Sequence, residues 1–170
     1  MIQVYTGSGK GKTTAALGLA FRALGHGKSV FLVQFMKKGT NLGEIKAAGN
    51  FKKFKIKQAG RGCWVRKGSP EAYKDRQCAQ EGWAYAQKAI ASKKYDVVIL
   101  DELNVAVYFD LLEANEVIKS LKRAPSKVEV VITGRHAHPD ILKIADLISE
   151  IKERRHYYKK GVVSRKGIEY

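Results

Sequence analysis

The residues with the clearest chemical meaning are the glycines, lysines and threonines near the start of the chain. The run from Val4 to Thr14 reads VYTGSGKGKTT and leads into an Ala-rich segment with helical character. Successive backbone N–H groups of such a loop converge on one concavity, and the helix that follows adds the positive end of its dipole. The pattern predicts a triphosphate site in which Lys12 reaches the terminal phosphates and the Thr13 hydroxyl holds Mg²⁺.

The loop departs at one position from the standard phosphate-loop pattern G-x-x-x-x-G-K-[ST]. Thr6 stands where the first glycine is expected, and Gly7 takes that role one residue later. A glycine-rich turn ahead of an ordinary helix is the alternative, which we disfavour because strand, glycines, Lys-Thr and helix occur together. The expected phosphate-binding residues are Gly7, Ser8, Gly9, Lys10, Gly11, Lys12, Thr13 and Thr14.

Length and composition indicate one soluble domain over residues 1–170. A chain of 170 residues with 45% hydrophobic residues can bury a substantial core. It contains no apolar stretch of about 18 residues, the length that spans a bilayer, so we expect no membrane segment and a cytoplasmic location. The two cysteines, Cys63 and Cys78, lack the spacing of a metal site and are expected to be reduced structural thiols.

A strongly basic stretch covers residues 37–67. The whole chain carries a net charge of +16, and this stretch holds ten Lys or Arg against one acid, Glu44, with three aromatic residues interleaved. One interpretation is a nucleic-acid-binding face. The other, which we favour, is an edge strand whose lysines prevent pairing with another sheet, because apolar residues and lysines alternate between positions 53 and 57.

Apolar strands alternate with helical patterns along the chain. The expected strands cover residues 29–36, the basic stretch near 53–57, and residues 95–100, 129–133 and 147–152. Helices are expected near residues 12–24, from Pro70 to Ser92 with Ser69 as its N-cap, and over residues 113–123 and 139–145. Ala72, Ala79, Trp83, Ala86 and Ile90 form the expected buried face of the second helix. This alternation predicts a three-layer α/β fold with a mainly parallel sheet, whose ligands bind at the carboxyl ends of the strands.

Acidic and basic side chains follow two of these strands at the same predicted edge. Asp101 and Glu102 end an apolar strand in the manner of a Walker B element, which helps to position Mg²⁺ opposite the loop hydroxyl. The predicted metal ligands are therefore Thr13 with Asp101 or Glu102; alternatively, the acids only cap the strand. Arg135 follows the next strand and is a candidate clamp for a phosphate oxygen, although a surface arginine would have the same sequence pattern.

These segments together resemble the P-loop type of ATP:corrinoid adenosyltransferases, over nearly the whole chain. The resemblance implies a P-loop nucleotide-binding fold of the RecA-like kind and a homodimer. Its marks are residues 6–16, 23–28, 33–35, 100–104 and 131–135, Gly161, and the ending Lys166-Gly167-Ile168-Glu169-Tyr170.

The resemblance implies that ATP lies in the loop with its 5′ carbon directed toward a reduced corrinoid, which takes the adenosyl group and releases triphosphate. Lys12 and Arg135 would be the catalytic residues, because they stabilise charge on the leaving triphosphate. Thr13 and Glu102 would bind Mg²⁺, and direct metal contact by Asp101 stays open. On this interpretation Glu102 is a metal ligand rather than a water-activating base.

The resemblance also assigns residues to the nucleoside and the corrinoid. Arg22 and His156 match positions that contact the nucleoside. The family's Phe-x-Trp, which displaces the lower ligand of cobalt, is replaced here by Gly62-Cys63-Trp64, so only Trp64 is expected to pack there. The basic charge suits an acidic electron-transfer partner such as the family's flavodoxin.

Two other functions remain as alternatives. A P-loop NTPase or kinase would use Glu102 as a base and would turn over ATP without corrinoid. A nucleic-acid-binding protein would use ATP as a switch through residues 37–67 and would bind with a steep salt dependence.

Overall fold

Six parallel strands form the central sheet of the computed structural model, which describes residues 1–62 and 71–170. The strands lie in the order β3-β2-β4-β5-β1-β6, and each pairs in parallel with its neighbours. Their bounds are β1 (Ile2–Thr6), β2 (Val30–Phe35), β3 (Phe54–Ala59), β4 (Val97–Asp101), β5 (Glu129–Thr133) and β6 (Leu147–Glu150). The predicted α/β fold is confirmed, and the sheet is entirely parallel in the described residues.

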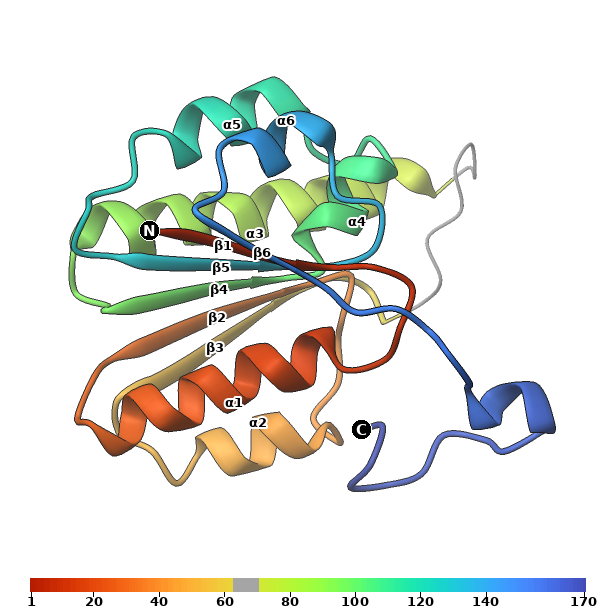
Figure 1. The fold of residues 1–170 in the computed structure, drawn as a ribbon. Helices are drawn as coiled ribbons and strands as arrows, with labels where there is room; N and C mark the ends of the chain where they lie inside the picture. Colours follow the sequence, from red (N-terminus) through yellow and green to blue (C-terminus); the bar gives the residue numbers. More distant parts are fainter. Residues whose placement is uncertain (63–70) are drawn as a thin grey trace.

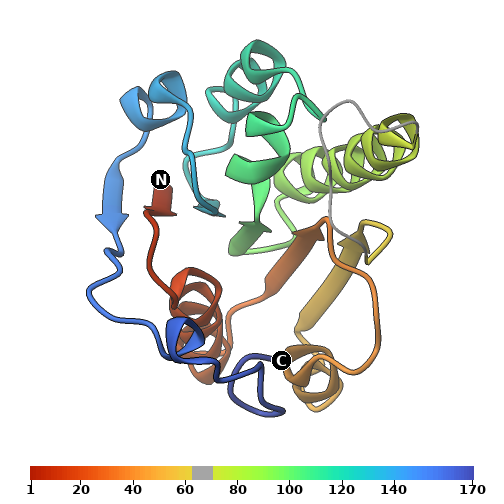
Figure 2. The same ribbon diagram turned by 90° about the vertical axis from the view of Figure 1, so that its right-hand side faces the viewer.

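Helices cover both faces of this sheet. Their bounds are α1 (Lys12–Gly25), α2 (Gly43–Ala48), α3 (Ala72–Ser92), α4 (Leu103–Tyr108), α5 (Ala114–Leu121), α6 (Pro139–Lys143) and the 3₁₀ helix η1 (Tyr157–Lys160). Figure 1 shows α1 and α2 below the sheet and α3, α4, α5 and α6 above it. Figure 2 looks onto the end of the sheet where the strands finish, with the C-terminal segment passing beside α1 and α2. Among the described residues, no helix is both long and apolar enough to cross a bilayer.

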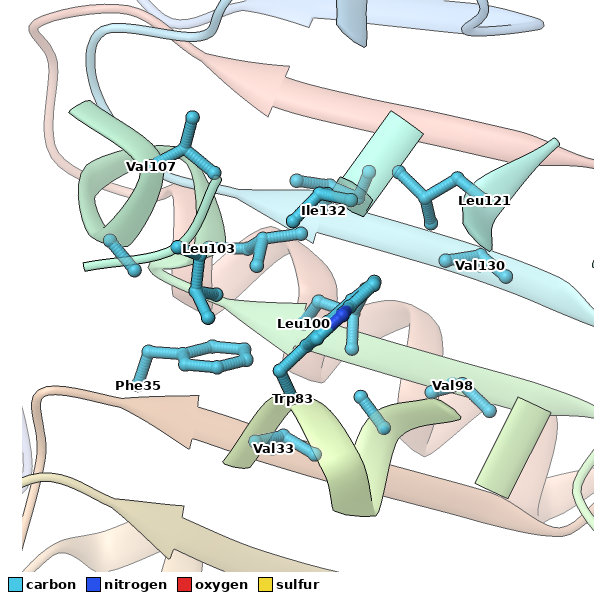
Figure 3. Close-up of a cluster of buried hydrophobic side chains, with 14 of the residues drawn as sticks. Val33, Phe35, Trp83, Val98, Leu100, Leu103, Val107, Leu121, Val130 and Ile132 are labelled. Atoms are coloured by element: carbon cyan, nitrogen blue, oxygen red, sulfur yellow. The ribbon is translucent and has the colours of Figure 1, made fainter. Parts of the chain in front are cut away.

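The core is divided between the two faces by the two-residue period of the strands. In β4, Val98 and Leu100 belong to the cluster under α3, α4 and α5, whereas Val97 and Ile99 belong to the cluster under α1. Figure 3 shows the first cluster, in which Trp83 of α3 lies over the strands. Because both faces are covered, the central strand β4 is apolar up to Asp101, and the sheet positions the loops that follow its strands.

The basic stretch forms the sheet edge that the favoured interpretation predicts. β3 is the outermost strand beside β2, with Phe54 buried and Lys55 and Lys57 exposed. The sequence analysis missed α2, which lies inside this stretch and has no fully buried residue. Nucleic-acid binding is not tested by this geometry.

Other differences concern element ends and short helices. Helix α3, the second of the predicted helices, begins at Ala72 with Glu71 as N-cap, two residues later than predicted. Ser69 and Pro70 lie outside the described residues. Ala72 is half-buried and is therefore not the core residue that we expected. The sequence analysis also missed α4 and η1, because helices of four to six residues show too little periodicity to be recognised.

Candidate nucleotide-binding site

The glycine-rich loop joins β1 to α1 and packs closely against the segment that follows β6. Gly7 and Gly11 have positive φ angles of 101° and 120°, which favour glycine. A Cβ atom on Gly7 would lie 2.5 Å from the carbonyl oxygen of Ile151, and the Gly9 N–H donates to that oxygen at 2.7 Å. The glycines therefore permit both the curvature of the loop and its contact with its neighbour.

Lys12, the first residue of α1, directs its ammonium group into the curve of the loop. Its Nζ donates to the carbonyl oxygens of Gly7 at 2.8 Å and Gly9 at 2.6 Å, and the residue is only 7% exposed. Burial is the main cause that lowers the pKa of Lys12, while Glu102 and Asp101 oppose this by favouring the charged form. The arrangement holds a positive charge at the place where the sequence pattern predicts phosphate.

Asp101 is fully buried at the end of β4 and joins three elements. Its Oδ1 accepts hydrogen bonds from the hydroxyls of Thr13 and Thr133, each at 2.7 Å. Its Oδ2 accepts from Lys37 Nζ at 2.8 Å. The phosphate loop and the acidic strand end are thus brought together, as the two motifs predict, and Asp101 orients the Thr13 hydroxyl.

Glu102 follows directly, in a left-handed conformation with φ of 63° that turns the chain from β4 into α4. Its N–H donates to Thr133 Oγ1 at 3.0 Å. Burial, followed by the charge of Asp101, raises the pKa of the Glu102 carboxyl, against the opposing effects of Lys37, Lys12 and Arg135. Glu102 is half-buried, and a carboxylate that is penalised in this way is stabilised by a bound cation.

The oxygen atoms of this cluster fit Mg²⁺. Thr13, Asp101 and Glu102 supply a hydroxyl and two carboxylates, which are the hard oxygen donors that Mg²⁺ prefers. Among the described residues, no group of three His, Cys, Asp or Glu could hold a metal ion by itself. In proteins Mg²⁺ is usually bound by one or two carboxylates together with substrate phosphates.

Arg135 acts on charged groups of the loop region, His156 belongs to the C-terminal segment, and Arg22 lies at the far end of α1. Arg135 is exposed after β5, and its charge contributes to the pKa values of Lys12 and Glu102. His156 is half-buried and caps η1, where its Nδ1 accepts from the Tyr158 N–H at 3.1 Å. Arg22 is in the last turn of α1, about 15 Å along the helix axis from Lys12. The roles of these three residues remain predictions.

The remaining predicted residues occupy different positions. Ser8 Oγ accepts from the Glu153 N–H at 3.3 Å, so this side chain fixes the loop to the segment after β6. Thr14 is exposed on α1, and Lys10 donates to the Ile168 carbonyl oxygen at 3.4 Å. Trp64 lies outside the described residues.

The C-terminal segment closes one side of this region. Glu169 accepts hydrogen bonds from Tyr157 and from the backbone N–H of Arg165, and Tyr170 lies beside Gly43 of α2. The Lys10 contact links this segment to the phosphate loop, and Figure 2 shows the end of the chain beside α1 and α2.

Two residues of the cluster were missed by the sequence analysis, Lys37 and Thr133. Lys37 lies two residues after β2, and Thr133 is the last residue of β5. β2 and β5 are the two neighbours of β4 in the sheet. Their position at the carboxyl ends of strands beside the acidic strand is the signal that could have identified them.

Comparisons with known proteins show similarity over the whole chain. A family model described as "ATP:corrinoid adenosyltransferase BtuR/CobO/CobP" matches residues 1–170. A corrinoid adenosyltransferase of Escherichia coli K12 is 39% identical over 173 residues, covering 100% of this chain and 85% of the relative. The corresponding Salmonella typhimurium LT2 protein is 40% identical with the same coverage. The solved KaiC-like protein PH0186 of Pyrococcus horikoshii OT3 shares the fold, with a TM-score of 0.55 and 14% identity, over 89% of this chain and 70% of that one.

Proposed function

The chain belongs to the family of ATP:corrinoid adenosyltransferases, and we propose that it transfers the 5′-deoxyadenosyl group of Mg-ATP to the Co(I) centre of a reduced corrinoid. The observation that carries the nucleotide part is the 2.7 Å hydrogen bond from Thr13 to Asp101, which joins the phosphate loop to the acidic end of β4. The family match over the whole chain supports the corrinoid part.

In the proposed reaction, the electron pair of Co(I) attacks the 5′ carbon of ATP. The bond between this carbon and the triphosphate oxygen breaks, and triphosphate leaves with the bonding electrons. Because Co(I) is itself the nucleophile, no general base is required. The protein positions the reactants in line and stabilises the negative charge that grows on the leaving group.

The residues of the loop have separate tasks in this proposal. Lys12 stabilises the leaving triphosphate from inside the curve of the loop, and Arg135 approaches the phosphates from the end of β5. Thr13 and Glu102 would hold Mg²⁺, while Asp101 orients Thr13. When bound, Mg²⁺ neutralises phosphate charge and fixes the geometry of the triphosphate.

Further parts of the proposal concern substrate contacts, the electron donor, the location of the protein and its oligomeric state. Arg22 and His156 would contact the nucleoside, and Trp64 the corrinoid. The net charge of +16 suits an acidic electron-transfer partner such as flavodoxin as the source of electrons for cobalt. We also propose that the protein is cytoplasmic and acts as a homodimer.

The test is an anaerobic reaction of the protein with Mg-ATP and chemically reduced Co(I) corrinoid. We expect loss of the Co(I) absorbance and formation of adenosylcorrinoid with intact triphosphate. The same protein without corrinoid should release negligible orthophosphate. Steady release of orthophosphate from ATP alone would contradict the proposal and support an NTPase, and salt-sensitive nucleic-acid binding without transfer would support the switch protein.

A further inference from the structure

Lys37 has no role in the reaction as proposed above, yet it contacts the centre of the site. The side chain lies just beyond β2 and is 30% exposed, and its Nζ is 2.8 Å from Oδ2 of the fully buried Asp101. Burial opposes the charge on Lys37, but the attraction of Asp101, their hydrogen bond, and the charges of Glu44 and Glu102 outweigh it and raise the pKa of the lysine. The ammonium group of Lys37, 2.8 Å from a buried carboxylate oxygen, is thus a cation held at the carboxylate pair.

The hydrogen bonds of Asp101 do not by themselves require a lysine. Oδ1 already accepts from Thr13 and Thr133, so a neutral donor at Oδ2 would complete the set without burying a second charge. Partly buried ion pairs carry a desolvation penalty that neutral groups avoid. The charge of Lys37, rather than only its hydrogen bond, is what distinguishes this arrangement.

The charges around Glu102 indicate what this cation does. The groups that act on its carboxyl are one anion, Asp101, and three cations, Lys37, Lys12 and Arg135. Such surroundings attract a polyanion and repel a free divalent cation. When a triphosphate occupies the loop, the site attracts a divalent cation instead of repelling it, because the triphosphate adds negative charge and oxygen ligands.

We propose that Lys37 is a positioning residue that occupies the outer oxygen of Asp101, so that Mg²⁺ enters the site together with the triphosphate and not alone. This inference deepens the proposed function and rests on it. The ammonium leaves Asp101 as the acceptor that orients Thr13 and leaves Glu102 as the carboxylate available to the metal.

The experiment measures binding of Mn²⁺, a spectroscopic substitute for Mg²⁺, by electron paramagnetic resonance of the free ion. Wild-type protein without nucleotide should bind Mn²⁺ weakly. Lys37→Gln, which keeps a hydrogen-bond donor without the charge, should bind it at least about tenfold more tightly, because one unit of nearby repulsion is lost. Lys37→Arg should behave as wild type.

Two controls separate this effect from a general change in charge. Lys28→Gln removes the lysine of an ion pair with Asp96 near the starts of β2 and β4, and it should leave Mn²⁺ binding unchanged. The double variant Lys37→Gln/Asp101→Asn should lose the gain, because the negative charge of Asp101 that Lys37 had neutralised is gone as well. If Lys37→Gln is poorly folded, a rise of its melting temperature with Mn²⁺ that wild type lacks supports the proposal by linkage.

Unchanged or weaker Mn²⁺ binding by Lys37→Gln would overturn the proposal and leave Lys37 as a structural ion pair. A gain that persists in the double variant would also overturn it, since the metal would then be bound elsewhere. These titrations contain no corrinoid. A failure of adenosyl transfer therefore affects the proposed function and leaves the Mn²⁺ result interpretable.

Discussion

Two lysine–aspartate pairs join β2 to β4, one at each end of the strands. At the amino end, Lys28 and Asp96 precede the two strands and are 3.3 Å apart. At the carboxyl end, Lys37 follows β2, and its Nζ is 2.8 Å from Asp101, the last residue of β4. In both pairs the lysine contacts one carboxylate oxygen, and two other donors contact the second oxygen.

The two pairs differ in burial and in the origin of those other donors. Asp96 is 41% exposed, and both donors belong to Ser29 at the start of the neighbouring strand. Asp101 is 0% exposed, and its donors come from α1 and β5. The first pair ties two strands together where water can replace any lost contact. The second pair links the phosphate loop to the sheet, so its loss should affect the reaction.

Replacing Lys12 of the phosphate loop should change the rate of adenosyl transfer most, compared with the matched change at the amino end of the strands. Lys12→Ala removes the ammonium that stabilises the leaving triphosphate, and we expect adenosyl transfer to fall by about 10³-fold. Lys28→Ala at the opposite end should change the rate by less than about twofold. Steady-state rates with Mg-ATP and Co(I) corrinoid measure both effects. Retained activity in Lys12→Ala would mean that the phosphate loop has been misassigned.

Replacing each of the two aspartates by asparagine should give the next largest difference in transfer rate between the two ends. Asp101→Asn places an amide beside Lys37 and weakens the acceptor of the Thr13 hydroxyl, so transfer should fall by about 10²-fold. Asp96→Asn should retain the wild-type rate. Transfer rates for both variants, measured after their folding has been checked by circular dichroism, test the contrast. Equal losses in the two variants would show that Asp101 acts through stability alone.

The sequence predicted the ends of the strands better than the contacts between them. β5 has the predicted bounds, because its apolar run is buried on both faces and ends at a glycine. The proximity of Thr13 to Asp101 was predicted because two motifs point to the same sheet edge. The contact of Lys37 with Asp101 was not, since it depends on β4 lying beside β2, whereas β3 is the next strand in the chain.

The sequence could not show whether Asp101 or Glu102 contacts the metal directly, for a related reason. Two adjacent residues at a strand end would normally point to opposite faces. Here Glu102 adopts a left-handed conformation, and its N–H bonds to Thr133, so both carboxylates affect the same site. This local turn depends on β5 and leaves no mark in the sequence of β4.

Loss of a single hydroxyl should lower the free energy of unfolding more at the carboxyl end of the strands than at the amino end. Thr133→Val removes a donor to Asp101 in buried surroundings and leaves the Glu102 N–H without its acceptor in partly buried ones. We expect a loss of about 2 kcal/mol in the free energy of unfolding. Ser29→Ala, the matched change at the exposed end, should cost about 1 kcal/mol or less because water replaces the hydroxyl. Urea denaturation measures both values, and a larger loss for Ser29→Ala would contradict the contrast in burial.

The smallest expected effect is the contribution of the Asp96 charge to the free energy of unfolding, and this contribution should depend on pH. Hydrogen bonds from the Ser29 N–H and hydroxyl hold the pKa of Asp96 below its usual value of about 3.9. Burial opposes them, and Lys28 adds a smaller effect that also lowers the pKa. A depressed pKa means that the ionised carboxylate stabilises the fold above about pH 4 and that this stability is lost as the pH falls through the folded-state pKa.

Asp96→Asn should therefore be less stable than wild type by at most about 1 kcal/mol at neutral pH, because the exposed pair is screened by solvent. The difference should shrink below about pH 4, where wild type also loses the charge. Unfolding free energies measured between neutral and acid pH test this. A difference that stays constant into acid would mean that the Asp96 hydrogen bonds act independently of its charge, and the two ends of β4 would then differ in burial but not in how their carboxylates use charge.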